Sequence, residues 1–295
     1  MQTEMLYGNG LKTKYSYDTR NQLTGIIVGV EGKPSIFEAK YSYNGNGNRI
    51  TKDEQVLYGL DAHITSLHTE YSYDSMNRMT GENLNGTLTS YSYDLAGNRT
   101  TKTVEGRKES YLYNSRNQLT ELISEDKKIC YSYDNAGSLV EEKHYTPDGE
   151  QTKSLAYSYD VYNRNILVEG ADFIQKNHYD AEGYRYAIEE NGKVTNFAYR
   201  GGMLLSELDE EKNCNKGYIL GNKYVGMWES GENSDNYSYY LTDEHGSIRF
   251  TLNETSDVEN YYQYSAFGEN LVREEKVSNR LRYNAQIEDD LTGLY

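Results

Sequence analysis

Aromatic and polar residues alternate in short runs that recur along this chain. At 91–93, the sequence Tyr-Ser-Tyr places two rings on one face of an extended strand and the serine on the other, because strand side chains alternate with period two. The pattern predicts a strand at each of seven tyrosine pairs: Tyr15 and Tyr17, Tyr41 and Tyr43, Tyr71 and Tyr73, Tyr91 and Tyr93, Tyr111 and Tyr113, Tyr131 and Tyr133, and Tyr157 and Tyr159. Weaker copies follow at 177–179 and 197–199.

A turn signal follows each tyrosine pair. Asp or Asn comes directly after the second tyrosine, and Gly or Asn comes three positions later. The first side chain caps backbone amides of a type I turn, and the later residue takes the positive φ that Gly and Asn tolerate best. The predicted turns carry Asp18 and Asn21, Asn44 and Gly47, Asp74 and Asn77, Asp94 and Gly97, Asp134 and Gly137, and Asp243 and Gly246.

The residues after each turn predict a return strand with one wet face. Segments 98–104 and 118–123 mix β-branched or aliphatic residues with charged ones. Strand, turn and strand form one hairpin, and most hairpins recur every 20 residues. One such hairpin buries too little apolar surface to fold alone, so we expect neighbours to stack into an array. Two longer steps, at 25–40 and 55–70, predict longer loops or strand extensions.

Composition agrees with an all-β array. The aromatic fraction of 13% is too high for a disordered chain, although only 36% of the residues are hydrophobic. Tyrosine, present 32 times, suits the array because its ring buries like phenylalanine while its hydroxyl reaches a polar partner. We expect these rings to pack between hairpins; the alternative is a row of rings that stacks on sugars.

Charge and cysteine content remove several classes. A net charge of -16 argues against binding to nucleic acid or to an anionic membrane surface. No apolar run is long enough to predict a membrane span, and 1–7 shows no signal-peptide pattern. Two cysteines, Cys130 and Cys214, give no disulfide framework and are expected as buried or half-buried thiols. We expect no cofactor.

The last third of the chain carries four specific strings. They are YYLTDEHGSIR at 239–249, YYQYSAFGE at 261–269, LRYN at 281–284 and DLTGLY at 290–295. In this order they resemble the Rhs repeat-associated core. The upstream phrases resemble the YD repeats of Rhs proteins, bacterial wall-associated proteins, insecticidal toxin complexes and teneurins. The resemblance covers 11–295 and divides the chain into a YD-repeat array at 1–236 and a core-like segment at 237–295.

This resemblance implies a strip of antiparallel hairpins that curves and spirals as part of a hollow shell. In that family the shell commonly encloses a C-terminal toxin, which an aspartyl self-cleavage step releases. The family's Asp-Pro-x-Gly cleavage motif does not occur up to Tyr295. We therefore assign self-cleavage to no residue. We expect a partial wall with a truncated core-like segment, belonging to a longer parent protein that is secreted or displayed on the bacterial cell surface.

Three other groups of residues have simpler interpretations. His63 and His68 are five apart, so on a strand they point to opposite faces and do not share a metal ion. The carboxylate pairs at 274–275 and 289–290 suggest glycoside hydrolysis, but adjacent strand residues diverge, so we interpret them as solvated loops. The repeated Asp is a turn cap, because no loop gathers the oxygen ligands that calcium requires. No catalytic residue and no metal site is predicted.

Two functions remain open. The favoured one is a non-enzymatic scaffold, part of a β-shell that encapsulates and helps deliver a C-terminal toxin in bacterial competition. Its partners would be the toxin domain of the parent chain or other shell segments. The alternative is a cell-surface adhesion module that binds a glycan or a partner protein through its repeat face. Open strand edges also predict self-association, because unpaired backbone groups at an edge can pair with another chain.

Overall fold

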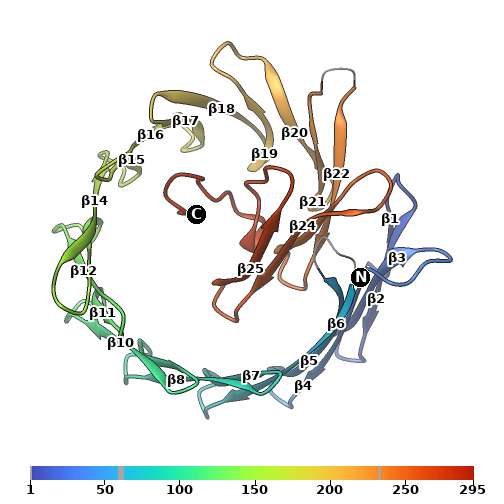
Figure 1. Ribbon diagram of the computed structural model, residues 1–295, viewed down its shortest axis with the longest axis horizontal. Helices are drawn as coiled ribbons and strands as arrows, with labels where there is room; N and C mark the ends of the chain where they lie inside the picture. The colour runs from blue at the N-terminus through green and yellow to red at the C-terminus, as the bar shows by residue number, and fades with distance from the viewer. Residues whose placement is uncertain (1, 59–62, 232–233) are drawn as a thin grey trace. The chain divides into compact units, whose positions relative to one another are not determined.

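The computed structural model describes residues 2–58, 63–231 and 234–295 (Figure 1). Within this part of the chain there are 25 β-strands and one short 3-10 helix. Two compact units emerge: a terminal unit of Met1–Gly86 with Lys216–Tyr295, and a middle unit of Thr87–Asn215. In both units the paired strands run antiparallel and are neighbours in sequence. The predicted all-β fold of repeated antiparallel hairpins is confirmed.

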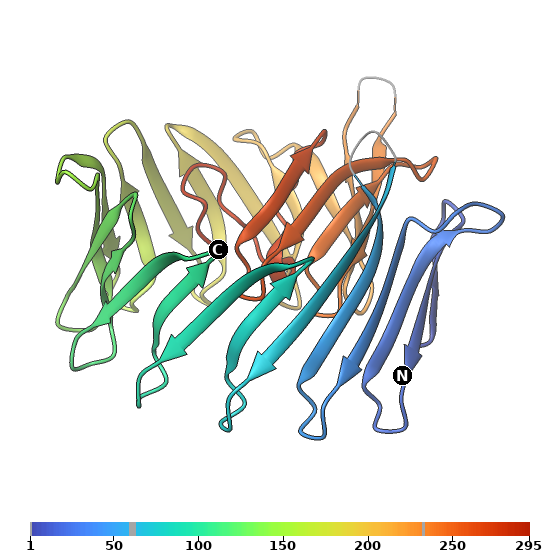
Figure 2. The same ribbon diagram turned by 60° about the horizontal axis from the view of Figure 1, so that its bottom comes forward.

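The terminal unit is built from both ends of the chain. Its elements are β1 (Glu4–Leu6), β2 (Leu11–Tyr17), β3 (Leu23–Val30), β4 (Phe37–Tyr43), β5 (Arg49–Tyr58), β6 (His63–Tyr73), β7 (Met79–Leu84), β20 (Cys214–Leu220), β21 (Tyr224–Glu229), β22 (Asn236–Thr242), β23 (Ile248–Leu252), β24 (Val258–Tyr264), β25 (Asn270–Glu275) and the 3-10 helix (Tyr283–Ala285). The long step at 55–70 is a strand extension, because β5 and β6 pair as far as Tyr58 opposite His63. The long step at 25–40 instead contains the loop 31–36 between β3 and β4. Figure 2 shows β2 to β6 as long neighbouring strands.

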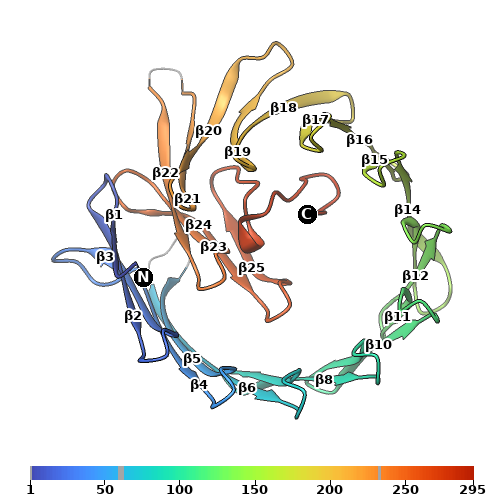
Figure 3. The same ribbon diagram turned by 180° about the vertical axis from the view of Figure 1, so that it is seen from behind.

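Two layers of the terminal unit meet face to face. The Phe37 ring of β4 lies 6.0 Å from the Phe250 ring of β23, and the Tyr7 ring lies 6.0 Å from that of Tyr239. Figure 3 shows β22 and β23 beside β1 to β5. The apolar core lies between these layers and includes Leu11, Ile26, Val28, Phe37, Val56, Leu241, Phe250, Leu252 and Tyr261. Strands more than 180 residues apart in sequence therefore share one core.

The middle unit repeats the hairpin without such a second layer. Its strands are β8 (Thr87–Tyr93), β9 (Arg99–Val104), β10 (Arg107–Tyr113), β11 (Leu119–Ile123), β12 (Lys128–Tyr133), β13 (Leu139–Tyr145), β14 (Gln151–Tyr159), β15 (Asn165–Glu169), β16 (Ile174–Tyr179), β17 (Arg185–Glu190), β18 (Lys193–Arg200) and β19 (Met203–Leu208). They follow a curved path in Figure 1. Its buried clusters are small; one contains Leu155, Tyr157 and Val168.

The compact units run across the predicted division at residue 236. That division separates two sequence patterns, whereas the terminal unit combines the first hairpins of the array with the core-like segment. Residues 237–295 pack on β1 to β5 because their apolar side chains, such as Phe250 and Tyr261, share one core with Phe37 and Val56. The division by motif therefore stays a prediction about the sequence, and the packing unit is larger.

Candidate functional site

The hairpin turns are built from the residues that the sequence marks. In the turn after Tyr73, the Asp74 Oδ1 accepts hydrogen bonds from the backbone N–H of Met76 and of Arg78, both at 2.9 Å. Asn77 takes φ 61°, and Gly47 takes φ 87° at the equivalent place. The same positive φ occurs at Asn21, Gly97, Gly137 and Gly246, and the same capping oxygen at Asp18, Asn44, Asp94, Asp134 and Asp243.

The two tyrosines of each pair differ in burial and in their place in the strand. The first ring is buried at Tyr41, Tyr71, Tyr91, Tyr111 and Tyr157, and half-buried at Tyr15 and Tyr131. The second ring is half-buried at Tyr17, Tyr43, Tyr73, Tyr93, Tyr113, Tyr133 and Tyr159. This second tyrosine lies where the pairing of the two strands shifts register, as between Ser42 and Tyr43.

The hydroxyl of the second tyrosine links one hairpin to the hairpin before it. Tyr43 donates to the Leu23 carbonyl oxygen at 2.7 Å, and Tyr73 donates to that of Arg49 at 2.8 Å. The same bond joins Tyr17 to Gln2, Tyr113 to Arg99, Tyr133 to Leu119, Tyr179 to Asn165, Tyr199 to Arg185 and Tyr264 to Ile248. We call this series the tyrosine ladder. It satisfies backbone carbonyls that a single hairpin would leave to water.

Within the terminal unit, a network of buried charges joins the two layers. Glu54 of β5 lies 2.8 Å from Arg249 of β23 and 3.0 Å from Lys52, and its side chain is 1% exposed. Arg249 Nε also donates to the Tyr262 carbonyl oxygen at 2.8 Å. Burial alone would raise the pKa of Glu54, but Arg249 and Lys52 lower that pKa to about 2. Glu54 is therefore ionised at neutral pH and holds β5 against β23.

A second ion pair lies beside the first. Arg49 of β5 pairs with Glu244, which follows β22, and Glu244 also accepts a hydrogen bond from the Tyr41 hydroxyl at 2.8 Å. The Arg49 guanidinium stacks 5.1 Å from the centre of the Tyr71 ring. Arg49 approaches His245 as well, with Nη2 3.4 Å from Nε2. Burial, followed by the Arg49 charge, lowers the pKa of His245, so the ring is neutral at pH 7.

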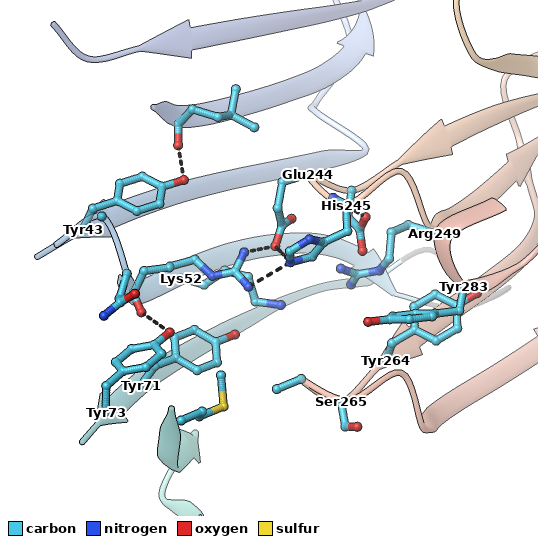
Figure 4. A pocket seen from close by; sticks show the side chains of 17 residues that line it. Tyr43, Lys52, Tyr71, Tyr73, Glu244, His245, Arg249, Tyr264, Ser265 and Tyr283 are labelled. Carbon is cyan, nitrogen blue, oxygen red and sulfur yellow. Dashed lines mark hydrogen bonds and ion pairs between the residues drawn. The ribbon is translucent and has the colours of Figure 1, made fainter. Parts of the chain in front are cut away.

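These groups surround a pocket of about 490 Å³ (Figure 4). Lys52, Arg249, Glu244 and His245 point toward one another across it. Its walls come from β4 to β7, from the turn between β22 and β23, from the end of β24 and from the 3-10 helix. The pocket lies inside the terminal unit, and a volume of this size suits a small molecule. We take the pocket and the ion pairs beside it as the candidate functional site.

The end of the chain forms a separate cluster in the same unit. Arg282, 2% exposed, pairs with Glu288 at 2.5 Å and with Glu275 at 3.1 Å. Tyr295 donates to Glu288 at 2.7 Å. Burial and the hydrogen bond to Glu288 raise the pKa of Tyr295, so its hydroxyl keeps its proton. The cluster folds the last fifteen or so residues back on β25.

Two expectations about carboxylates and cysteines need correction. Residues 274–275 belong to strand β25 and pair with β24, so they do not form a loop. In the second pair, Asp289 is only 3% exposed because the Arg282 cluster draws the chain end into the unit, whereas Asp290 is exposed as expected. Cys130 is half-buried as expected, but Cys214 is exposed because it begins β20 at a turn.

Metal and membrane sites gain no support from the described residues. No group of three or more His, Cys, Asp or Glu side chains gathers there to hold an ion. His68 pairs with Asp53 at 2.6 Å, and the side chain of His63 lies outside the described residues. Across the same residues, no helix is long and apolar enough to cross a membrane.

Sequence reasoning missed the residues that join the layers. The sequence predicted none of the ion-pair residues. It predicted only the turn at Asp243 and Gly246, which contains Glu244 and His245. From the sequence, charged residues within a return strand, such as Lys52 and Glu54, are expected on its solvent-exposed face. A signal exists at Arg249, because it is flanked by Ile248 and Phe250 in a fully buried strand. A cation in an apolar strand calls for a buried carboxylate partner.

Comparison with known proteins supports the YD-repeat resemblance. Residues 1–145 match the family model described as Teneurin YD-shell. The chain is 34% identical over 122 residues to the tRNA nuclease WapA of Bacillus subtilis (strain 168), and 33% identical over 122 residues to the tRNA(Glu)-specific nuclease WapA of Bacillus subtilis subsp. natto (strain BEST195). Each alignment covers 40% of this chain and 5% of the relative, so the chain spans a small part of these proteins.

A solved structure shows the same fold. The crystal structure of TcdB2-TccC3-TEV matches 100% of this chain and 19% of that chain, with a TM-score of 0.51 and 14% sequence identity. At this identity the likeness concerns the fold alone. The predicted resemblance to YD-repeat shell proteins is confirmed by the family match and by this fold.

Proposed function

We propose that this chain is a non-enzymatic scaffold, part of a β-shell that encapsulates and helps deliver a C-terminal toxin in bacterial competition. The observation that carries the proposal is the tyrosine ladder, which bonds hairpins to their predecessors within both units and so favours a wall. The YD-shell match and the fold shared with TcdB2-TccC3-TEV support it. The partners would be the toxin domain of the parent chain or other shell segments.

The tyrosine ladder also weighs against the adhesion alternative. Sugar-binding rows of rings keep their faces and hydroxyls free for the ligand. Here the hydroxyls of the second tyrosines donate hydrogen bonds to backbone carbonyls, and most of the first tyrosines are buried. The repeat tyrosines therefore favour a wall over a glycan-binding face.

Protection from protease tests the scaffold proposal. The full-length parent protein is digested in its folded state, and cleavage of the segment after Tyr295 is followed over time. An enclosing wall predicts cleavage at least tenfold slower than for the same segment produced alone. Equal rates would contradict encapsulation, and binding of the chain to a glycan array would then favour adhesion.

A matched pair of variants connects this test to the terminal unit. Glu54→Gln breaks the buried ion pair with Arg249 and is expected to speed the cleavage. Glu4→Gln removes an exposed ion pair with Lys12 and should leave the rate unchanged. If the two variants are cleaved at the same rate, the ion pair between the two layers has no part in protection.

Secretion or display on the bacterial surface is the location that we propose with this role. Fractionation of the native host, with detection of the parent protein in the medium and on intact cells, measures it. Recovery only from the cell interior would contradict the delivery part of the proposal and leave the scaffold part standing.

A further inference from the structure

The cations beside the pocket of the terminal unit contact few acceptors. Glu54 is the carboxylate that serves both Lys52 and Arg249, while Glu244 serves Arg49. Three cations therefore share two carboxylates in this network. Asp243 lies nearby, but its Oδ1 caps the turn by accepting from the N–H of His245 and of Ser247, each at 2.9 Å. The charges of Asp243 and Glu82 also act on these cations, so the site is short of contacting acceptors rather than of negative charge.

Lys52 brings one of these cations to the pocket. Its side chain is 13% exposed and lines the cavity, and its ammonium points toward the centre in Figure 4. Burial lowers the pKa of Lys52, although the Glu54 charge opposes this shift. An ammonium has three donors, and the printed partner of this one is Glu54.

Arg249 adds to the same shortage of acceptors. Its Nη1 binds Glu54 and its Nε binds the Tyr262 carbonyl oxygen, but its buried Nη2 has no acceptor among the described residues. Buried donors in native proteins are nearly always satisfied. Behind Lys52, the guanidinium therefore keeps a nitrogen that no acceptor among the described residues uses.

Aromatic rings form the rest of the wall. Tyr71, Tyr73, Tyr264 and Tyr283 line the pocket, and the Tyr264 and Tyr283 rings meet at 5.4 Å. The hydroxyls of Tyr73 and Tyr264 belong to the tyrosine ladder, so these residues offer ring surface to an occupant. Flat apolar walls next to a cation suit a ring that carries an acid group.

We propose that this pocket binds a small organic carboxylate whose body is a six-membered ring. The carboxylate oxygens accept from Lys52 and are stabilised by the Arg249 charge behind it. The ring of the ligand packs against the tyrosines. A charge-assisted hydrogen bond of this kind is stronger than a neutral one, and the largely buried position of Lys52 strengthens it further. The proposal does not depend on the scaffold function.

Calorimetric titration of the whole chain with paired ligands tests the binding. D-glucuronate and benzoate each carry a carboxylate on a six-membered ring, and D-glucose and benzyl alcohol are their neutral counterparts. At least one acid should bind ten times or more tightly than its neutral counterpart and than acetate, which has no ring. The stronger acid identifies whether the ring is a sugar or an aromatic. Binding by neither acid, or equal binding by its neutral counterpart, would overturn the proposal.

Variants locate the site. Lys52→Gln should weaken the bound acid at least tenfold. Met79→Trp fills the pocket without changing a charge and should abolish binding even if Lys52→Gln fails to fold. The matched control is Lys216→Gln, because Lys216 is a lysine with 10% exposure, paired with Glu229 outside the pocket. Unchanged affinity in Met79→Trp would place the ligand elsewhere and refute the assignment.

Discussion

In the terminal unit the aromatic side chains of one layer meet those of a second layer, whereas in the middle unit they meet side chains of neighbouring hairpins. Phe250 is fully buried between Phe37 and Tyr261. Phe197 of the middle unit is nearly as buried, but beneath the Arg185 guanidinium. The same repeat can therefore bury its rings by facing another layer or by covering them with stacked cations.

Burial and cooperativity are therefore separate properties of these two units. A two-layered core links strands distant in sequence, so the terminal unit should open as a whole. A row of hairpins that contact mainly their neighbours behaves as a one-dimensional array, and its parts open more independently. Hydrogen exchange read by mass spectrometry resolves peptides from both units in the intact chain.

Phe250→Ala should have the largest effect. Removal of a fully buried phenylalanine costs about 3–5 kcal/mol, and the cavity here faces a second layer that cannot collapse easily. We expect faster exchange throughout the terminal unit. In the middle unit, Phe197→Ala should speed exchange mainly in β17 to β19. If Phe197→Ala opens the whole middle unit, the one-dimensional description fails.

Glu54→Gln should cost nearly as much, about 3 kcal/mol or more, because it leaves Lys52 and Arg249 buried without a carboxylate. Urea unfolding followed through terminal-unit peptides measures the loss. Asp160→Asn removes a partly exposed pair with Arg164 in the middle unit and should destabilise the chain far less, because solvent screens this pair. Comparable losses from the two variants would show that the buried network is no more important than a surface pair.

Acid should act through the same carboxylate. The folded pKa of Glu54, about 2, lies below its ordinary value of 4.5, so its stabilisation is fully present above pH 4.5. It is lost as the pH falls from 4.5 toward 2, by on the order of 3 kcal/mol. Stability of the terminal unit should fall over this window in the native chain and fall less in Glu54→Gln. Parallel curves would assign the acid sensitivity to other groups.

Gly97→Ala tests a turn of the middle unit. Gly97 has φ 92° and an added Cβ would meet nothing within 4 Å, so the cost is that of the backbone alone, about 1–2 kcal/mol. Gly246→Ala in the terminal unit, at φ 87° and equally open, should cost the same. Thermal unfolding of both variants measures it, with Gly97→Asn as the milder control. A far larger loss at Gly246 would reveal strain passed to the neighbouring ion pairs.

Tyr133→Phe should have the smallest effect, about 0.5–1.5 kcal/mol, because it removes one hydroxyl bond of the tyrosine ladder to the Leu119 carbonyl oxygen. Faster exchange is expected in β11 to β13 alone. Tyr145→Phe, half-buried in the same unit, serves as the control hydroxyl. An effect that spreads to distant hairpins would show that the ladder couples the repeats more widely.

Much of the hairpin was open to prediction, because the turn and the strand are local. Asp74 and Asn77 specify their turn through their own side-chain and backbone preferences, and the tyrosine spacing sets the strands. The turns closed by Gly149, Lys212 and Ser256 escaped notice because they lack the Tyr-x-Tyr phrase. The turn closed by Gly268 follows Tyr262 and Tyr264, but Ser265 stands where the pattern requires Asp or Asn.

The contacts between the two layers could not be predicted from local sequence patterns. Glu54 and Arg249 are 195 positions apart, and nothing local to Glu54 distinguishes it from a solvated residue. The pairing results from two layers that come together through Phe37 and Phe250. Long-range packing of this kind depends on which hairpins face each other, and a repeated pattern gives every hairpin the same local signal.

The tyrosine ladder has a consequence for how such a chain changes length over generations. Each copy of the phrase contains the hydroxyl that reaches back and the carbonyl that the next copy will need. A duplicated copy therefore contains both the donor and the acceptor that the tyrosine ladder needs. A deletion of one whole copy removes one donor and one acceptor together, so the remaining copies can still pair. Recombination can lengthen or shorten the row without any adjustment at the joint, whereas the terminal unit, with partners fixed far along the chain, accepts no such insertion.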